Sequence, residues 1–136
     1  MRGIHHVGLA VDDLDEAVAT YERLFDAAVE RRASGDGLDA ATVLVGGDRI
    51  ELLTSADGET TIGRFLARRG PGLHHVAYAV DDIRGELDAL RASGAELIDA
   101  EPRPGLFGLE VAFIHPGSVA GVLVEYVQYG GDGDGS

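Results

Sequence analysis

Two pairs of histidines stand in two nearly identical segments of this chain. The segment GIHHVGLAVDD begins at Gly3, and GLHHVAYAVDD begins at Gly72. Imidazole is a common metal ligand, and it also transfers protons near neutral pH. One interpretation is a duplicated structural module in which the histidines are incidental. The other, which we favour, is that each copy contributes one imidazole to a shared site.

Alternation along each segment selects one histidine of each pair. A β-strand points successive side chains to opposite faces, so the histidine that shares a face with small residues can be identified. His6 and His75 lie on such faces, together with Gly8, Ala10, Ala77 and Ala79. His5 and His74 fall on the opposite, bulkier faces. Small residues build a poor core, so we expect His6 and His75 to face a site, with His5 and His74 as neighbours rather than ligands.

The same alternation singles out two glutamates. In the apolar run 49–53, Glu51 points away from Ile50 and Leu52, and in the run 121–127, Glu125 points away from its bulky neighbours. A glutamate that is buried without a partner is costly. Each of these residues taken alone is explained as a strand-end histidine or an edge glutamate. Taken together, two imidazoles and two carboxylates predict a site for one divalent cation such as Mn, Co, Ni, Zn or Fe(II).

The elements that carry these residues form one supersecondary unit written twice. Each copy starts as a strand and turns helical after two aspartates, which cap helix N-termini well. Three apolar runs follow in each half, so each half is expected to form a βαβββ module. The expected strands after the helices are a weak early run, 40–45 and 49–53 in the first half, and 95–100, 110–115 and 121–127 in the second.

Three helices are expected. The first covers 16–25, is capped by Asp12 or Asp13, and has one apolar stripe made of Ala17, Tyr21, Leu24 and Phe25. The second begins at a cap formed by Asp81 or Asp82 and runs to about Arg91. The third links the halves over 59–69 and stops at the sequence RGPG.

The predicted fold class is α+β, with two tandem βαβββ modules forming a curved sheet around a metal-containing cleft. The modules span about 3–57 and 72–129, joined by the linking helix 59–69, and together make a single domain over 1–129. The Gly- and Asp-rich residues 130–136 are expected to form a flexible tail.

Composition excludes several kinds of chemistry. The 136 residues include no cysteine, and all 11 basic residues are arginine. Thiolate chemistry, a lysine Schiff base and a P-loop lysine are therefore impossible. The formal net charge of −13 argues against a nucleic-acid partner. No apolar run is long enough for a membrane helix and no signal peptide is evident, so we expect no membrane partner and a cytoplasmic location.

The segments IHHVGLAVDDLDEA, IELL, GLHHVAYAVDDI and FIHPGSVAGVLVEY resemble the methylmalonyl-CoA epimerase family of the vicinal oxygen chelate (glyoxalase/bleomycin resistance/dioxygenase) superfamily. The resemblance implies that His6, Glu51, His75 and Glu125 bind one divalent metal ion, with Glu51 standing where some members have Gln. It also implies an acyl-CoA substrate and epimerisation of methylmalonyl-CoA by proton abstraction at C2, through a metal-stabilised enolate.

Epimerisation needs one acid/base group on each side of the planar carbon. The resemblance assigns one of these roles to Glu125. The family's second glutamate falls in the segment ASGDGLDAATVLV, where Gly35 or, with a shift of one, Asp36 takes its place. We therefore expect Glu125 and Asp36 to be the catalytic residues. The chain also departs from the family at Phe107, where histidine is common.

Three alternative functions share the fold. A glyoxalase I-like isomerase (of the lactoylglutathione lyase type) would use the same four ligands, but its usual DPDG turn is replaced here by HPGSVAG. A ring-cleaving dioxygenase needs only three ligands and an open coordination face, so a fourth candidate ligand argues against that function. A non-catalytic protein that sequesters drugs has usually lost the metal ligands, whereas this chain keeps all four candidate positions. The absence of a GxSxG elbow argues against serine hydrolysis.

Further expectations concern the binding of coenzyme A, the role of His115 and the oligomeric state. Coenzyme A carries phosphates, and the one tight cluster of cations is Arg64, Arg68 and Arg69, which equally suits the dipole at a helix C-terminus. His115, before a proline, is expected to shape a turn or line the cleft. Homologous proteins usually pair, so a homodimer is expected.

Overall fold

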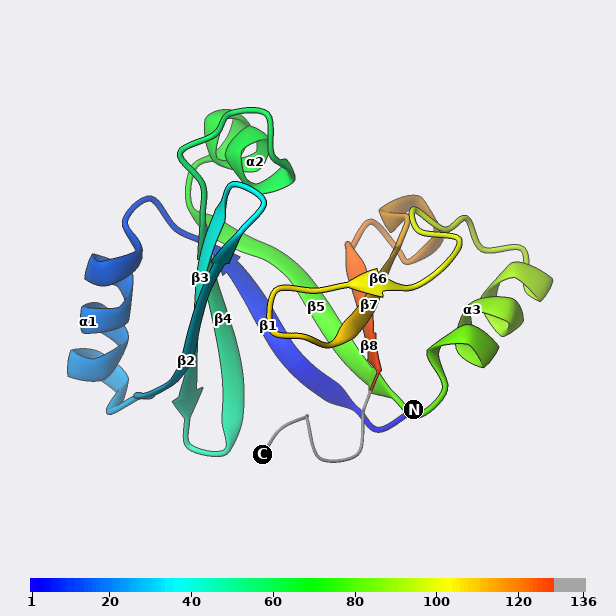
Figure 1. Ribbon diagram of the computed structural model, residues 1–136, viewed down its shortest axis with the longest axis horizontal. Helices are drawn as coiled ribbons and strands as arrows, with labels where there is room; N and C mark the ends of the chain where they lie inside the picture. The colour runs from blue at the N-terminus through cyan, green and yellow to red at the C-terminus, as the bar shows by residue number, and fades with distance from the viewer. Residues whose placement is uncertain (129–136) are drawn as a thin grey trace. The chain divides into compact units, whose positions relative to one another are not determined.

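The computed structural model describes residues 1–128, so the predicted tail over 130–136 lies outside the described residues (Figure 1). The chain divides into two compact units. The first-repeat unit comprises residues 6–74, and the second-repeat unit comprises, among the described residues, 1–5 and 75–128. Each unit contains the strands and the helix of one predicted module.

The first-repeat unit confirms the βαβββ plan. Its strands are β1 (Ile4–Ala10, within this unit from His6), β2 (Ala28–Gly35), β3 (Leu38–Val45) and β4 (Asp48–Thr54). They lie side by side in the order β2-β3-β4-β1. Strand β1 runs parallel to β4, whereas β2, β3 and β4 form antiparallel pairs. The weak early run is thus a full strand, β2.

Helix α1 (Leu14–Phe25) packs on one face of this sheet, against β3 and β4. The side chain of Asp13 accepts a hydrogen bond from the Glu16 backbone N–H at 3.0 Å, so Asp13 rather than Asp12 is the cap. The buried stripe differs from the predicted one. Helix residues that pack on the core are Leu14, Ala17, Val18 and Tyr21.

Leu24 and Phe25 are exposed, so placing them on the buried stripe was wrong. The helix begins two residues earlier than predicted, and Leu14 and Val18 shift the buried face around the axis. Phe25 instead sets its ring edge-on against Tyr21, with centroids 5.1 Å apart.

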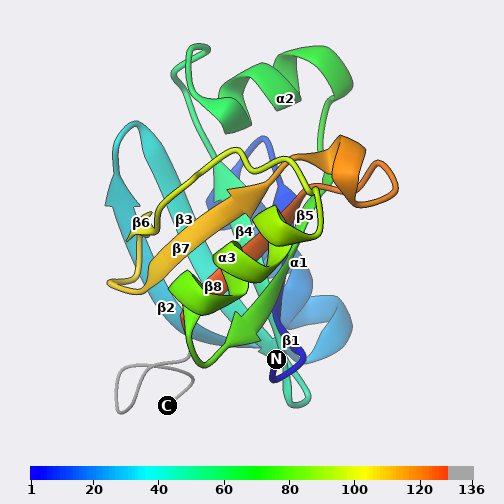
Figure 2. The same cartoon turned by 90° about the vertical axis from the view of Figure 1, so that its right-hand side faces the viewer.

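The second-repeat unit repeats the plan with a shorter edge. Its elements are β5 (Gly72–Val80, within this unit from His75), α3 (Ile83–Ala92), β6 (Arg103–Pro104), β7 (Glu110–Ile114), the 3-10 turn η1 (Pro116–Ser118) and β8 (Val124–Gln128). The strand order is β5-β8-β7-β6, with β5 parallel to β8 and the other pairs antiparallel. Asp82 caps α3 by accepting from the Gly85 N–H at 3.2 Å. Helix α3 packs on β7 and β8 (Figure 2).

The predicted strand over 95–100 was wrong. This segment makes a single bridge, between Leu97 and Ile114. The N–H groups of Ile98 and Asp99 both donate to the carbonyl of Phe113, and the Asp99 carboxylate accepts from the Phe113 N–H at 2.8 Å. A side chain thus takes the place of a ladder partner, so the ladder cannot continue. The edge strand forms later, at Arg103–Pro104.

The linking helix α2 covers Thr61–Arg69, close to the predicted 59–69. Its cap is Thr60, whose hydroxyl accepts from the Gly63 N–H at 2.9 Å, and it ends at Gly70 with φ of 74°. Within residues 1–128, no helix combines the length and apolar character that crossing a membrane requires.

Candidate metal centre

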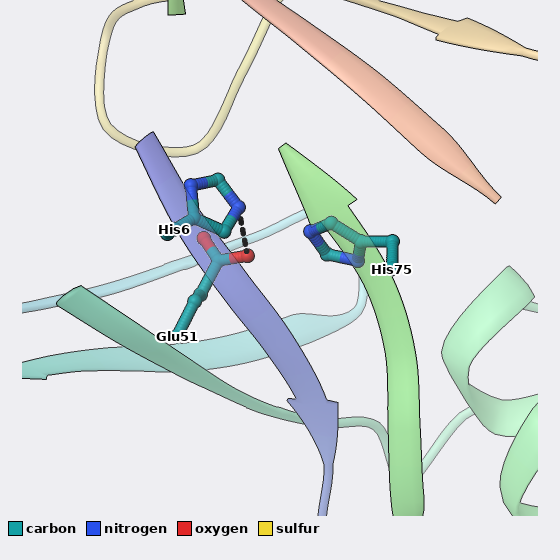
Figure 3. Close-up of side chains that lie close together, drawn as sticks. All are labelled: His6, Glu51 and His75. Carbon is teal, nitrogen blue, oxygen red and sulfur yellow. Dashed lines mark ion pairs between the residues drawn. The ribbon is translucent and has the colours of Figure 1, made fainter. Parts of the chain in front are cut away.

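His6 and Glu51 form a buried pair in the first-repeat unit. Strand β1 presents His6, and parallel strand β4 presents Glu51, whose register partner on β1 is Gly8. Because Gly8 lies two residues after His6, both side chains share one face. His6 Nε2 lies 3.3 Å from Glu51 Oε1 (Figure 3), and the two residues are only 5% and 8% exposed.

His75 and Glu125 form the matching pair in the second-repeat unit. His75 extends from β5 (Figure 3), and Glu125 is the register partner of Ala77, again two residues after the histidine. His75 Nε2 lies 3.2 Å from Glu125 Oε1, and the residues are 3% and 7% exposed. The Phe113 ring, opposite Glu125 on β7, stands edge-on to His75 at 5.7 Å between centroids. The duplication thus preserves both the residues and their pairing.

The chemistry of each pair fits a divalent cation. Two ligands on one cation, bonded at about 2.0–2.2 Å, stand about 3.0–3.5 Å apart. The observed nitrogen-to-oxygen distances of 3.3 and 3.2 Å fall in this interval. Imidazole with carboxylate is a donor set that suits borderline metals. His6, Glu51 and His75 are all buried, and each offers one donor atom of a kind that binds such an ion. That all four residues bind a single cation stays a prediction.

A polar network lies on the face that carries Glu51. Thr42 is the register partner of Glu51 on β3, and Arg49 precedes Glu51 by two residues on β4. The Thr42 hydroxyl donates to Glu30 at 3.0 Å, and the Arg49 guanidinium contacts both oxygens of Glu30 at 2.8 and 3.1 Å. The Arg49 hydrogen bond lowers the pKa of Glu30, against the opposing effect of burial.

Sequence reasoning missed Glu30 and Arg49. The two residues stand 19 positions apart, and β2 shifts register between Val29 and Arg31, which breaks the alternation that would place Glu30 on a face. Glu30 lies on β2 and Arg49 on β4, with β3 between them, so no local sequence signal links the two residues.

We expect Glu30→Gln to lower the free energy of unfolding by about 1–3 kcal/mol at pH 7, because it removes the charge from a mostly buried ion pair. The folded-state pKa of Glu30 lies below its ordinary value of 4.5. Its contribution is therefore present above about pH 4.5 and is lost as the pH falls through the lowered pKa. Urea unfolding of the parent and of Glu30→Gln measures the difference in their free energies of unfolding, which should be smaller at pH 3.5 than at pH 7. Glu22→Gln, at an exposed position on α1, is the control, and equal effects of both variants would contradict the expectation.

The remaining candidate residues lie elsewhere. Asp36 and Gly37 form the exposed two-residue turn between β2 and β3, with φ angles of 54° and 80°. The Gly37 carbonyl accepts from the Ser55 hydroxyl at 2.7 Å, which ties this turn to the loop before α2. His115 is exposed, and its Nδ1 accepts from the Gly117 N–H at 3.0 Å, which confirms its predicted role in a turn.

Comparison with known proteins agrees with this geometry. The family model described as "Glyoxalase/Bleomycin resistance protein/Dioxygenase superfamily" matches residues 5–113. A mitochondrial methylmalonyl-CoA epimerase from Dictyostelium discoideum is 35% identical over 90% of this chain and 75% of its own. An ethylmalonyl-CoA/methylmalonyl-CoA epimerase from Cereibacter sphaeroides is 33% identical over 92% of this chain and 96% of its own.

Solved structures give the same result. The methylmalonyl-CoA epimerase from Mycobacterium tuberculosis matches with a TM-score of 0.90 and 33% identity, over 95% of this chain and 89% of that one. A methylmalonyl-CoA epimerase in complex with methylmalonyl-CoA and ammonium has a TM-score of 0.90 and 27% identity, over 98% of both chains. These matches confirm the predicted vicinal oxygen chelate fold. The chain belongs to the glyoxalase/bleomycin resistance protein/dioxygenase superfamily and, within it, to the methylmalonyl-CoA epimerase family of isomerases.

Proposed function

We propose that this protein interconverts the 2R and 2S forms of methylmalonyl-CoA, using one divalent cation held by His6, Glu51, His75 and Glu125. The observation that carries the proposal is the buried histidine–glutamate pair, which occurs once in each repeat with the same register and nearly the same distance. The relatives and structures that bear the name of this activity support the choice of substrate.

A bound divalent cation supplies Lewis-acid stabilisation for negative charge that develops on a thioester oxygen. In the proposed ligand set the two imidazoles would be neutral nitrogen donors, and the two carboxylates would offset much of the charge of the cation. Burial of both pairs keeps water away and strengthens the electrostatic attraction.

The reaction removes one proton from C2 and adds one proton to the opposite side of the same carbon. In our proposal, one of the two acid/base groups Glu125 and Asp36 takes the C2 proton, and the other delivers a proton to the opposite side of the carbon. The electron pair of the broken C–H bond is delocalised toward the thioester oxygen and returns when the new C–H bond forms. Glu125 already lies beside a ligand histidine. Asp36 lies at the tip of the β2–β3 hairpin, so its role depends on the substrate reaching that turn.

We expect the protein to exchange the C2 proton of methylmalonyl-CoA with solvent. Incubation of one epimer in deuterium oxide should give deuterium at C2 and a mixture of both epimers, as followed by NMR. Propionyl-CoA is the control, because it has the thioester but no free carboxylate and should exchange much more slowly. Rapid isomerisation of a hemithioacetal with no exchange at C2 would show a glyoxalase I-like enzyme instead. Tight binding of an apolar drug with neither activity would indicate a sequestering protein.

The homodimer and the cytoplasmic location remain predictions from the sequence and the family resemblance. Light scattering coupled to size-exclusion chromatography tests the first. A mass corresponding to one chain at micromolar concentration would contradict it.

A further inference from the structure

Helix α2 presents three arginines without a carboxylate partner among the described residues. Arg64, Arg68 and Arg69 are all exposed, and within residues 1–128 none of them forms an ion pair. Most other arginines are neutralised by a carboxylate within 4 Å, namely Arg2, Arg32, Arg49, Arg84, Arg91 and Arg103. In a chain of net charge −13, cations left unpaired in one place are therefore exceptional.

The dipole of α2 accounts for only part of this cluster. Arg68 and Arg69 lie in the last turn, where positive charge is favourable. Arg64 lies one turn earlier, and its guanidinium donates to the Glu59 carbonyl at 2.5 Å. Arg64 and Arg68 are four residues apart, so they are neighbours on one helix face, where like charges repel. An anionic ligand would remove this repulsion.

Two rings connect this basic helix to the strand that carries a proposed metal ligand. The Arg69 guanidinium lies over the Phe65 ring at 6.0 Å, and the Phe65 ring stands edge-on to His74 at 5.1 Å between centroids. His74 immediately precedes His75 in β5. The cation–π contact favours a position of the Arg69 head group over the Phe65 ring.

We infer that Arg64, Arg68 and Arg69 bind the phosphate groups of the coenzyme A part of the substrate. The inference rests on the proposed acyl-CoA substrate and adds a site that binds the nucleotide part of that substrate. Guanidinium groups recognise phosphate oxygens through paired, charge-assisted hydrogen bonds, and coenzyme A carries several such oxygens. The pantetheine arm separates its phosphates from the thioester, so their cations need not lie at the metal ligands. Because the rest of the chain is strongly acidic and repels phosphate groups, the phosphates are expected to bind at this local basic cluster.

The test compares substrates with and without the nucleotide. We expect the variant with Arg64→Gln, Arg68→Gln and Arg69→Gln to raise KM for methylmalonyl-CoA about 10-fold or more, with kcat little changed. The same variant should leave KM for methylmalonyl-pantetheine unchanged, because that thioester lacks phosphates. Arg23→Gln is the matched control, since Arg23 is also exposed, lies in the last turn of α1 and has no ion pair among the described residues.

Direct binding of free coenzyme A separates this inference from the proposed reaction. Calorimetry should show that the parent protein binds coenzyme A more tightly than 3′-dephospho-coenzyme A or pantetheine, that higher salt weakens the binding, and that the triple variant loses the preference. Should the triple variant bind coenzyme A like the parent, with an unchanged KM, the inference is wrong while the epimerase proposal stands. If coenzyme A binds through these arginines but no epimer forms, the proposed reaction is wrong and the phosphate site stands. Thermal melting checks that each variant is folded.

Discussion

Replacing either His6 or His75 with alanine is expected to lower the affinity of the protein for a divalent cation at least about 100-fold. Changes to residues that merely support a ligand already cost 10–100-fold, so the loss of a ligand must cost at least as much. Both side chains are buried next to a carboxylate, and alanine leaves that carboxylate without the imidazole. Epimerase activity should fall with the metal content, which elemental analysis of the purified variants measures.

The neighbouring histidines provide matched controls. His5 and His74 precede His6 and His75 in the same strands, where alternation points them to the opposite face. His5→Ala and His74→Ala should therefore keep the cation affinity of the parent. Full metal occupancy in both His6→Ala and His75→Ala would show that the ligand assignment is wrong.

Removal of the cation should also destabilise the parent. A cation at 1,000 times its Kd stabilises the folded state by about 4 kcal/mol, so a strong chelator should lower Tm on the order of 10 °C. The chelator should have little effect on His6→Ala. An unchanged Tm of the parent would count against a bound cation in the native protein.

The features that the sequence predicted correctly are those set by short-range geometry. The period of two in a strand placed His6 and Glu51 on one face, and the same rule placed His75 and Glu125, because alternation needs no knowledge of the partner strand. The aspartate caps followed from the same kind of local rule, and the structure chose between neighbours that the sequence left open.

The features that the sequence missed depend on distant partners. Residues 95–100 have an apolar composition, but the contacts of Asp99 with Phe113, 14 residues later, decide that they form no strand. The bulge at Glu30 arises only when β2 pairs with β3, and the bond of Glu30 to Arg49 arises only when β4 pairs with the other edge of β3. Leu24 and Phe25 fitted a helical stripe equally well until the position of the sheet selected another.

Replacing Glu125 with glutamine should impair both cation affinity and turnover, since this residue is proposed to be a ligand and an acid/base group. A glutamine at the same place keeps the size of the side chain but cannot accept a proton at neutral pH. Turnover should fall at least about 100-fold, the usual contribution of a positioned acid/base group. Saturating cation should restore occupancy without restoring the rate. Recovery of full activity at high cation concentration would leave Glu125 as a ligand only.

Asp36→Asn isolates the second acid/base group. Asp36 has φ of 54°, a conformation that asparagine also tolerates, and an Asn-Gly turn suits this hairpin as well as Asp-Gly does. The variant should therefore keep its fold and its cation affinity while turnover falls about 100-fold or more. Asp39 is the alternative carboxylate near this turn: it lies in β3 and accepts from the Ser34 hydroxyl at 2.5 Å. Loss of turnover in Asp39→Asn but not in Asp36→Asn would move the role to Asp39.

An Asp36→Asn variant as active as the parent would move the second role to another group. In the sheet of the first-repeat unit, β2 carries Glu30, which bonds to Thr42 and Arg49 on the face of Glu51. Arg49 lowers the pKa of Glu30, which makes it a weaker base. His115 uses Nδ1 in its own turn. Loss of turnover in Glu30→Gln but not in Asp36→Asn would identify Glu30 as the base despite that lowered pKa. Full activity in both variants would indicate that a water molecule carries the proton on that side of the carbon.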